Sequence, residues 1–107
     1  MKTVSILILE TSVPAAIVDP RYMFSAVNEF YKSAGHQPFF KIQLVGLTKE
    51  VKLNDGLFTV HPDVLLKDVK KTDLIIIPAI GGDVKLAIKK NKDFLPWILQ
   101  QFKGGVE

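Results

Sequence analysis

The segment Asp73–Asp83 (DLIIIPAIGGD) constrains the fold of this chain more than any other. Four consecutive aliphatic residues at 74–77 predict a strand that is apolar on both faces, which fits the middle of a parallel sheet. Proline and two glycines end that strand, and Asp83 can cap the helix that follows. Open α/β sheets bind ligands at such turns, so the sequence predicts the edge of a small-molecule site here.

Length and composition limit the other possibilities. The chain has 107 residues, enough for one small domain (1–107), and its 48% hydrophobic and 23% charged residues are typical of a globular protein. The net charge of +3 comes from scattered basic residues, which argues against a nucleic-acid groove. With no cysteine in the chain, disulfides, thiolate metal sites and a cysteine nucleophile are excluded within it. His36 and His61 have no partners at metal-ligand spacing, so we expect neither a metal nor a cofactor.

The amino-terminal apolar run at 3–9 is interpreted as a buried strand. Glu10 ends the run too early for the core of a signal peptide. No apolar stretch approaches the ~20 residues needed to cross a bilayer. We therefore expect a cytoplasmic protein with no membrane association.

Strand and helix patterns alternate along the rest of the chain. A loop follows the first strand, and we expect a helix capped by Asp19, with Pro20 in its first turn and Gly35 at its end. The later elements are expected as a strand at 39–47, a hairpin at 48–60 with its turn at 54–56, a short helical piece at 61–71, the strand at 74–77, a helix at 84–90, and a helix capped by Asp93 and stopped at 104–105. This order predicts an α/β fold with a parallel sheet and helices on both faces.

Helical spacing also predicts which apolar residues pack on the sheet. These are Met23, Phe24, Val27, Phe30, Tyr31 and Ala34 on the first helix, Val84, Ala87 and Ile88 on the second, and Leu95, Ile98, Leu99 and Phe102 on the third.

Two places in the sequence could carry chemistry. Glu10 follows the first strand and could act as a base or bind a polar ligand, or it could be an ordinary solvated loop residue. The amides of Gly81 and Gly82 could converge on an anion at a helix start, or the glycines could serve only a turn with positive φ. The chain lacks a phosphate-binding loop, a dinucleotide fingerprint and a serine-nucleophile elbow. Residue chemistry alone therefore predicts a pocket and no particular reaction.

The order and spacing of these segments resemble the ThiJ/PfpI superfamily, the class I glutamine amidotransferase-like group with a flavodoxin-like fold. The version at the amino terminus of AraC-type bacterial transcription regulators is the most similar, and the resemblance spans nearly the whole chain. The positions that carry it are Pro20, Phe24, Ala26, Val27, Asn28, Pro78, Gly81 and Gly82.

The chain also departs from the pattern of the family's enzymes. The resemblance implies an acidic residue about four positions before Pro20, where this chain has Ala16. Residues 105–107 resemble the start of the strand that leads to the family's cysteine, so the cysteine and the later histidine are not in this chain. The part that the resemblance retains is the oxyanion-side turn at Ile80, Gly81 and Gly82. We expect the chain to be the amino-terminal part of a longer domain, with an incomplete sheet that exposes an apolar edge.

The resemblance implies a ligand-sensing regulatory domain of an AraC-type regulator without catalytic activity. A small polar effector would bind near Glu10, Ala16, Ile80, Gly81 and Gly82. DNA would be bound only by a helix-turn-helix region outside this chain, and the protein would be a homodimer. The alternative is a ThiJ/PfpI-type hydrolase or glyoxalase-like enzyme whose cysteine and histidine lie beyond the chain. A phosphorylation receiver is disfavoured because a single acid follows the first strand, and a flavodoxin is disfavoured because no Ser/Thr-rich phosphate loop does.

Overall fold

Strand β1 (Lys2–Leu7) is the central strand in the computed structural model, which describes residues 1–107. It pairs in parallel with β2 (Phe40–Gly46) on one side and with β6 (Leu74–Ile76) on the other. The short β5 (Val64–Leu65) extends the sheet beyond β2, again in parallel. The order β5-β2-β1-β6 is that of a flavodoxin-like α/β sheet.

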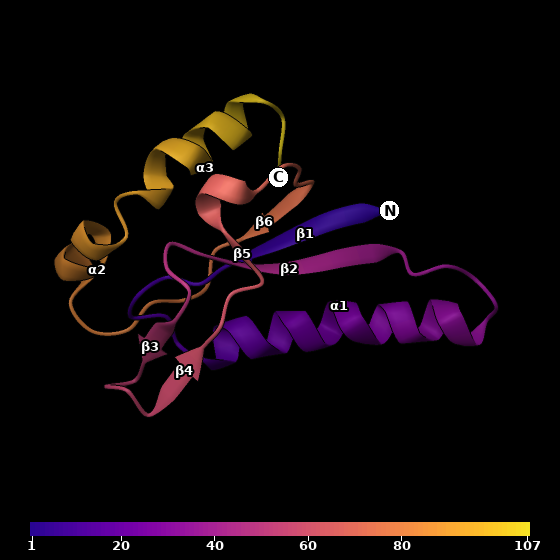
Figure 1. The fold of residues 1–107 in the computed structure, drawn as a ribbon, viewed down its shortest axis with the longest axis horizontal. Coiled ribbons are helices and arrows are strands. Elements are labelled where there is room, and N and C mark those ends of the chain that lie inside the picture. The colour runs from indigo at the N-terminus through magenta and orange to yellow at the C-terminus, as the bar shows by residue number, and fades with distance from the viewer.

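Helices cover both faces of this sheet (Figure 1). Helix α1 (Ala15–Ser33) lies along one face, and α2 (Val84–Lys90) and α3 (Phe94–Lys103) lie on the other side. The strands β3 (Val51–Leu53) and β4 (Phe58–Val60) form a separate two-stranded hairpin, and one 3-10 turn, η1 (Leu66–Asp68), follows β5. The α/β fold with helices on both faces is therefore confirmed.

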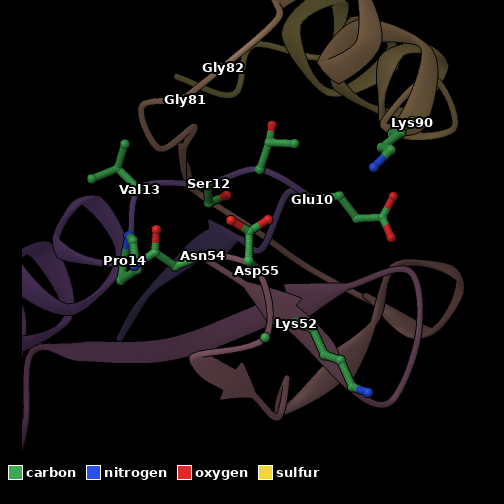
Figure 2. Close-up of a pocket in the computed structure, with 12 residues that line it drawn as sticks. Glu10, Ser12, Val13, Pro14, Lys52, Asn54, Asp55, Gly81, Gly82 and Lys90 are labelled. Atoms are coloured by element: carbon green, nitrogen blue, oxygen red, sulfur yellow. The ribbon is translucent and has the colours of Figure 1, made fainter.

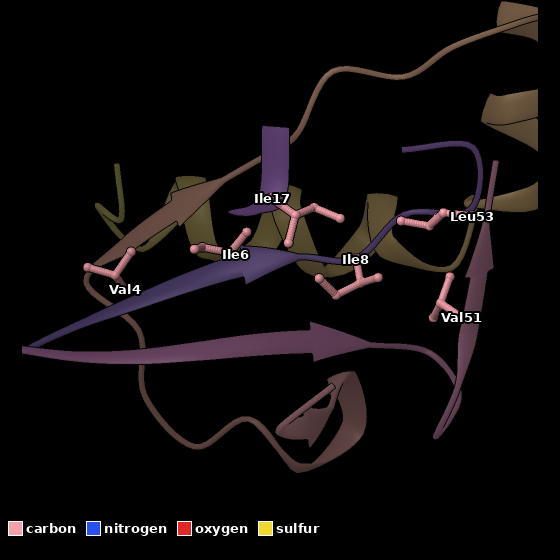
Figure 3. Close-up of a cluster of buried hydrophobic side chains, with 6 residues drawn as sticks. All are labelled: Val4, Ile6, Ile8, Ile17, Val51 and Leu53. Carbon is pink, nitrogen blue, oxygen red and sulfur yellow. The ribbon is translucent and has the colours of Figure 1, made fainter. Parts of the chain in front are cut away.

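The core consists of two layers because side chains alternate along β1. The layer on the α1 side joins the first strand and the residues after it to α1 and the hairpin (Figure 3); its buried members are Val4, Ile6, Ile8, Ile17, Val51 and Leu53. The layer on the α3 side contains Leu7, Leu9, Val45 and Phe94. The expectation of a first strand covered on both faces is thus confirmed.

Asp73 joins the start of β6 to the amino-terminal end of β1 by two hydrogen bonds. Its carboxylate accepts a hydrogen bond from the Thr3 amide at 2.8 Å, and the Asp73 amide donates to the Thr3 carbonyl at 2.8 Å. Lys71 lies 3.8 Å from the same carboxylate. The Thr3 hydrogen bond, with a smaller contribution from Lys71, lowers the pKa of Asp73 below its ordinary value of 3.8.

Several elements differ in detail from the expectations. Strand β6 is the last in the strand order, with β1 on one side. On its other side, the Ile75 amide donates to the Glu107 carbonyl at 2.7 Å. The short helical piece expected in the segment 61–71 is present only as the single 3-10 turn η1, and the two-residue β5 precedes it. Asp93 precedes α3, but its side chain caps no amide there. The hairpin and the cap at Asp83 were correct, with Asp83 accepting from the Lys85 amide at 2.9 Å.

Helix α1 starts at Ala15, four residues before the predicted cap. The amides of Ile17 and Val18 both donate to the Pro14 carbonyl, so the chain is already helical ahead of Asp19. Asp19 therefore caps nothing, and Pro20 lies inside the helix. Since proline has no amide hydrogen, the helix loses one bond there.

The predicted inward faces were also partly wrong. Ala87, Ile98 and Phe24 pack inward as expected. The exposed residues that were expected to be inward are Met23, Val27, Phe30, Ala34, Val84, Ile88, Leu95, Leu99 and Phe102. The buried face of α3 is instead rotated to Phe94, Trp97 and Ile98. No helix of the structure combines the length and the apolar character that crossing a bilayer requires.

Candidate functional site

Two loops meet at the carboxyl end of the sheet, one after β1 and one after β6. They pair as a short antiparallel bridge between Ser12 and Ile80. The Val13 amide donates to the Ala79 carbonyl and the Gly81 amide donates to the Thr11 carbonyl, both at 2.8 Å. Main-chain hydrogen bonds therefore join two segments that are far apart in the sequence, 11–13 and 79–81. We call these paired segments the floor of the site.

A buried amide side chain holds the first of these loops in place. Asn91, the C-cap residue of α2, accepts from the Glu10 amide at 2.8 Å and donates to the Glu10 carbonyl at 2.9 Å. Its side chain also donates to the Ala87 carbonyl at 2.8 Å. Asn91 thus uses its whole amide group to join the loop after β1 to the end of α2.

The loops and the hairpin border a partly open cavity of about 530 Å³, within the size range of small-molecule sites. Figure 2 shows its lining, which comes from the loop after β1, the β3–β4 hairpin, the glycine turn and α2. Charged residues of both signs line it: the acidic Glu10 and Asp55, and the basic Lys52 and Lys90. In Figure 2 the ammonium group of Lys52 points away from the glycine turn. Val13 is the hydrophobic residue of the lining. Such a cavity can bind a polar or charged molecule by hydrogen bonds and ion pairs.

Three of the five residues predicted for this site line the cavity, and two lie outside its lining. Glu10, Gly81 and Gly82 line the cavity together. Ile80 lies next to it in the bridge with Ser12 and does not line it. Ala16 lies in the first turn of α1, also outside the lining. The predicted set is therefore brought to one end of the sheet, with three of its members at the cavity surface.

The two glycines of the turn differ in what their amides can do. The Gly81 amide already donates to Thr11 and is not free to bind an anion. The Gly82 amide donates no hydrogen bond within the chain. Gly82 also has φ = 74°, in the region that favours glycine. Gly82 therefore has both properties considered for this turn: a positive φ, and an amide that is free to bind an anion.

Thr11 has a strained main chain at the centre of the floor. Its φ is 71°, which is rare for a β-branched residue. Its hydroxyl oxygen is buried without a hydrogen-bond partner. Strained conformations of this kind persist only where the surrounding structure stabilises them, and they are common at functional sites.

Sequence reasoning missed the charged residues that the hairpin and α2 bring to the cavity. Asn54 and Asp55 form the hairpin turn, with φ values of 55° and 56°, and this turn was predicted without any role at the site. Nothing in the local pattern of Lys52 or Lys90 distinguishes them from the other lysines. No group of three or more His, Cys, Asp and Glu side chains that could hold a metal ion occurs in residues 1–107.

No protein-family model matches this sequence, and no curated protein matches it. Several solved structures share its fold. A candidate transcriptional regulator from Vibrio parahaemolyticus superposes with a TM-score of 0.76 at 20% identity, over 98% of this chain and 53% of that protein. An AraC family transcriptional regulator from Pseudomonas putida gives 0.64 at 15% identity, over 99% of this chain and 61% of the other. Toxoplasma gondii DJ-1 gives 0.63 at 16% identity, over 99% and 53%.

These matches show that the chain shares the fold of DJ-1/ThiJ/PfpI-like domains, which is the fold that the resemblance implied. Structures named as transcriptional regulators are among those that share it. At identities of 20% and below, the similarity extends to the fold alone. The chain spans about half the length of the Vibrio parahaemolyticus protein and of DJ-1.

Proposed function

We propose that this chain belongs to the effector-sensing domain of a bacterial AraC-type transcription regulator and has no catalytic activity of its own. The observation that carries the proposal is the polar cavity at the carboxyl end of the sheet, lined by Glu10, Gly82 and charged groups of both signs. The fold shared with the Pseudomonas putida regulator supports the same assignment.

The effector in this proposal is a small polar molecule. It would sit between the loop after β1 and the hairpin, where Lys90 can bind acidic groups and Glu10 and Asp55 can bind basic ones. DNA binding would belong to a helix-turn-helix region outside residues 1–107. The chain has no cysteine, so it contains no candidate for the nucleophile that the alternative enzymatic function needs.

The loop that lines the cavity leads directly into α1, so ligand binding could move this helix. Val13 and Pro14 line the cavity, and α1 starts at the next residue, Ala15. A ligand that binds more tightly to one position of this loop would shift the position of α1. In a homodimeric regulator, such a shift would change how the two copies are arranged.

Thermal denaturation with a panel of polar metabolites tests the proposal. The panel contains amino acids, polyamines and short carboxylates. A compound present at ten times its Kd stabilises the folded state by roughly 1.4 kcal/mol, which raises the Tm of a domain of this size by several degrees.

Matched variants then test where the compound binds. Lys90→Ala and Asp55→Asn should reduce the Tm shift, because both side chains line the cavity. Lys89→Ala should leave it unchanged, since Lys89 is exposed on the same helix but lies outside the lining. A shift that persists in both cavity variants contradicts the proposed site. Turnover of methylglyoxal by the purified protein would contradict the non-catalytic assignment.

A further inference from the structure

The outer edge of β2, the side away from β1, has one open hydrogen-bonding position. The Ile8 amide donates to the Val45 carbonyl at 2.7 Å, so β2 bonds to β1 through its odd-numbered residues. Main-chain groups alternate in direction along a strand, so those of Phe40, Ile42 and Leu44 point to the outer edge. The amide and carbonyl of Ile42 make no hydrogen bond there, because β5 begins to pair only at Val45.

The two neighbouring positions on this edge show which groups fit such a place. At Phe40, the carboxamide of Asn28 accepts from the main-chain amide at 2.9 Å and donates to the carbonyl at 2.8 Å. At Leu44, the Asp63 carboxylate accepts from the main-chain amide and the Asp63 amide donates to the carbonyl, both at 2.8 Å. Each position is therefore filled by an acceptor and an N–H donor held side by side, and Asn28 supplies both with one carboxamide.

A cavity of about 450 Å³ adjoins the open position, and we call it the β2-edge cavity. Ile42 belongs to its lining, while the Ile42 side chain packs against the core layer on the α1 side. Side chains alternate along a strand, so Lys41 and Gln43 extend from the opposite face, and both also line the cavity. Ile42 therefore offers the cavity its main chain. The β2-edge cavity shares no residue with the cavity at the carboxyl end of the sheet.

Gln43 presents a free acceptor to the β2-edge cavity. It is only 8% exposed, and its Nε2 donates to the Ser5 hydroxyl oxygen at 2.9 Å. The Ser5 hydroxyl donates to Thr72 at 2.8 Å and the Thr72 hydroxyl donates to the Leu74 carbonyl at 3.1 Å, so this chain of donors fixes the orientation of the Gln43 amide. Its Oε1 accepts no hydrogen bond. This oxygen is not sealed from solvent, since the fully buried unpartnered side-chain oxygen of the protein belongs to Thr11.

The charges around the β2-edge cavity favour an anion. Lys41 and Lys70 line it, are exposed and form no ion pair. Lys71 also lines it, with its ammonium group 3.8 Å from Asp73. Asp63 and Asp68 are the acidic residues of the lining, and the Asp63 carboxylate already binds a main-chain amide. The lining therefore has an excess of ammonium groups that can bind a carboxylate or phosphate.

We infer that the β2-edge cavity binds a small molecule that carries a primary carboxamide and an acidic group. The carboxamide binds the main chain of Ile42 in the way that Asn28 binds that of Phe40, and its second N–H donates to Gln43 Oε1. The acidic group lies toward Lys41 and Lys70. The inference uses none of the residues of the proposed effector site and is independent of that proposal.

Titration of the isotope-labelled protein with succinamate, followed by NMR of the amide groups, tests this inference. Succinamate carries a carboxamide at one end and a carboxylate at the other. The largest change should occur at the Ile42 main-chain amide and the Gln43 side-chain amide. Succinate has no N–H for the Ile42 carbonyl, so it should bind roughly tenfold more weakly. Butanamide has no acid, and the loss of an exposed ion pair should weaken its binding about threefold.

Matched variants show whether the two ends of succinamate bind as inferred. Lys41→Ala combined with Lys70→Ala should weaken succinamate about threefold and leave butanamide unchanged, because only the acid contacts these lysines. Lys67→Ala is the control, exposed in the turn η1 and outside the lining, and should change neither. An Ile42 amide that does not respond to millimolar succinamate would overturn the inference. Equal binding of succinate and succinamate would also overturn it, as would changes confined to Glu10 and Gly82 at the other cavity.

Discussion

Replacing Asn91 by alanine should destabilise the protein more than any other change to a polar residue near the cavity. The Asn91 side chain is 7% exposed and makes three hydrogen bonds, two with the main chain of Glu10 and one with the Ala87 carbonyl. A hydrogen bond contributes about 0.5–1.5 kcal/mol net, and a buried group left without its partner costs more. We therefore expect Asn91→Ala to lower the free energy of unfolding by roughly 2–4 kcal/mol, a large part of the ~5–15 kcal/mol typical of a domain.

Urea unfolding followed by circular dichroism measures this loss. With an m-value of about 1–3 kcal/mol per molar urea, the midpoint should fall by roughly 1–2 M. Asn91→Asp should be at least as damaging at neutral pH, because a carboxylate cannot donate to the Glu10 and Ala87 carbonyls. Lys92→Ala is the control, since Lys92 is exposed in the same turn and makes no side-chain hydrogen bond.

Hydrogen exchange distinguishes a local effect from a global one. The Glu10 amide donates to Asn91, so its exchange should accelerate in Asn91→Ala even under conditions where β1 stays protected. An Asn91→Ala protein whose stability is within 0.5 kcal/mol of the parent, the usual range for surface changes, would refute the reasoning. It would mean that water replaces all three hydrogen bonds at this position.

Two further predictions concern the glycine turn and the acid end of the sheet. Gly82→Ala should lower the free energy of unfolding by about 1–2 kcal/mol in urea, because Gly82 has a positive φ. Gly81→Ala should be tolerated, since an added Cβ meets only the Thr11 carbonyl at 3.9 Å. Equal losses of stability in the two variants would contradict this account. Asp73, whose pKa is lowered mainly by the Thr3 amide, stabilises the fold above its ordinary pKa of 3.8 and loses this contribution as the pH falls through the lower folded value. Urea midpoints measured on acidification should therefore fall less steeply in Asp73→Asn than in the parent, and parallel curves would contradict the assignment.

Much of the fold could be predicted from the local sequence. The apolar run before Glu10 predicted a strand buried on both faces, and the turn at 54–56 predicted the hairpin. Asp83 was correctly predicted to cap α2. In each case the signal is a continuous apolar run or a short turn or capping motif, which neighbouring residues define without help from the rest of the chain.

The helix faces show where this local reasoning ends. Phe30 and Met23 have the spacing of a core face, yet both are exposed, because α1 is apolar on more than one side. Periodicity gives the spacing of apolar residues, but the direction in which a helix turns them depends on where the sheet lies. The start of α1 at Ala15 was missed for a related reason, since Pro14 begins the helix without a side-chain cap.

The sequence by itself determined that strands and helices alternate, and that loops with Glu10 and Gly82 follow two of the strands. Only the tertiary structure decided that these loops share a cavity with Asp55 and Lys90, and that Asn91 binds Glu10 across 81 residues of chain. The physical reason is that strand and turn propensities act over a few neighbouring residues, whereas a site is formed by groups that meet only when the parallel strands are placed side by side.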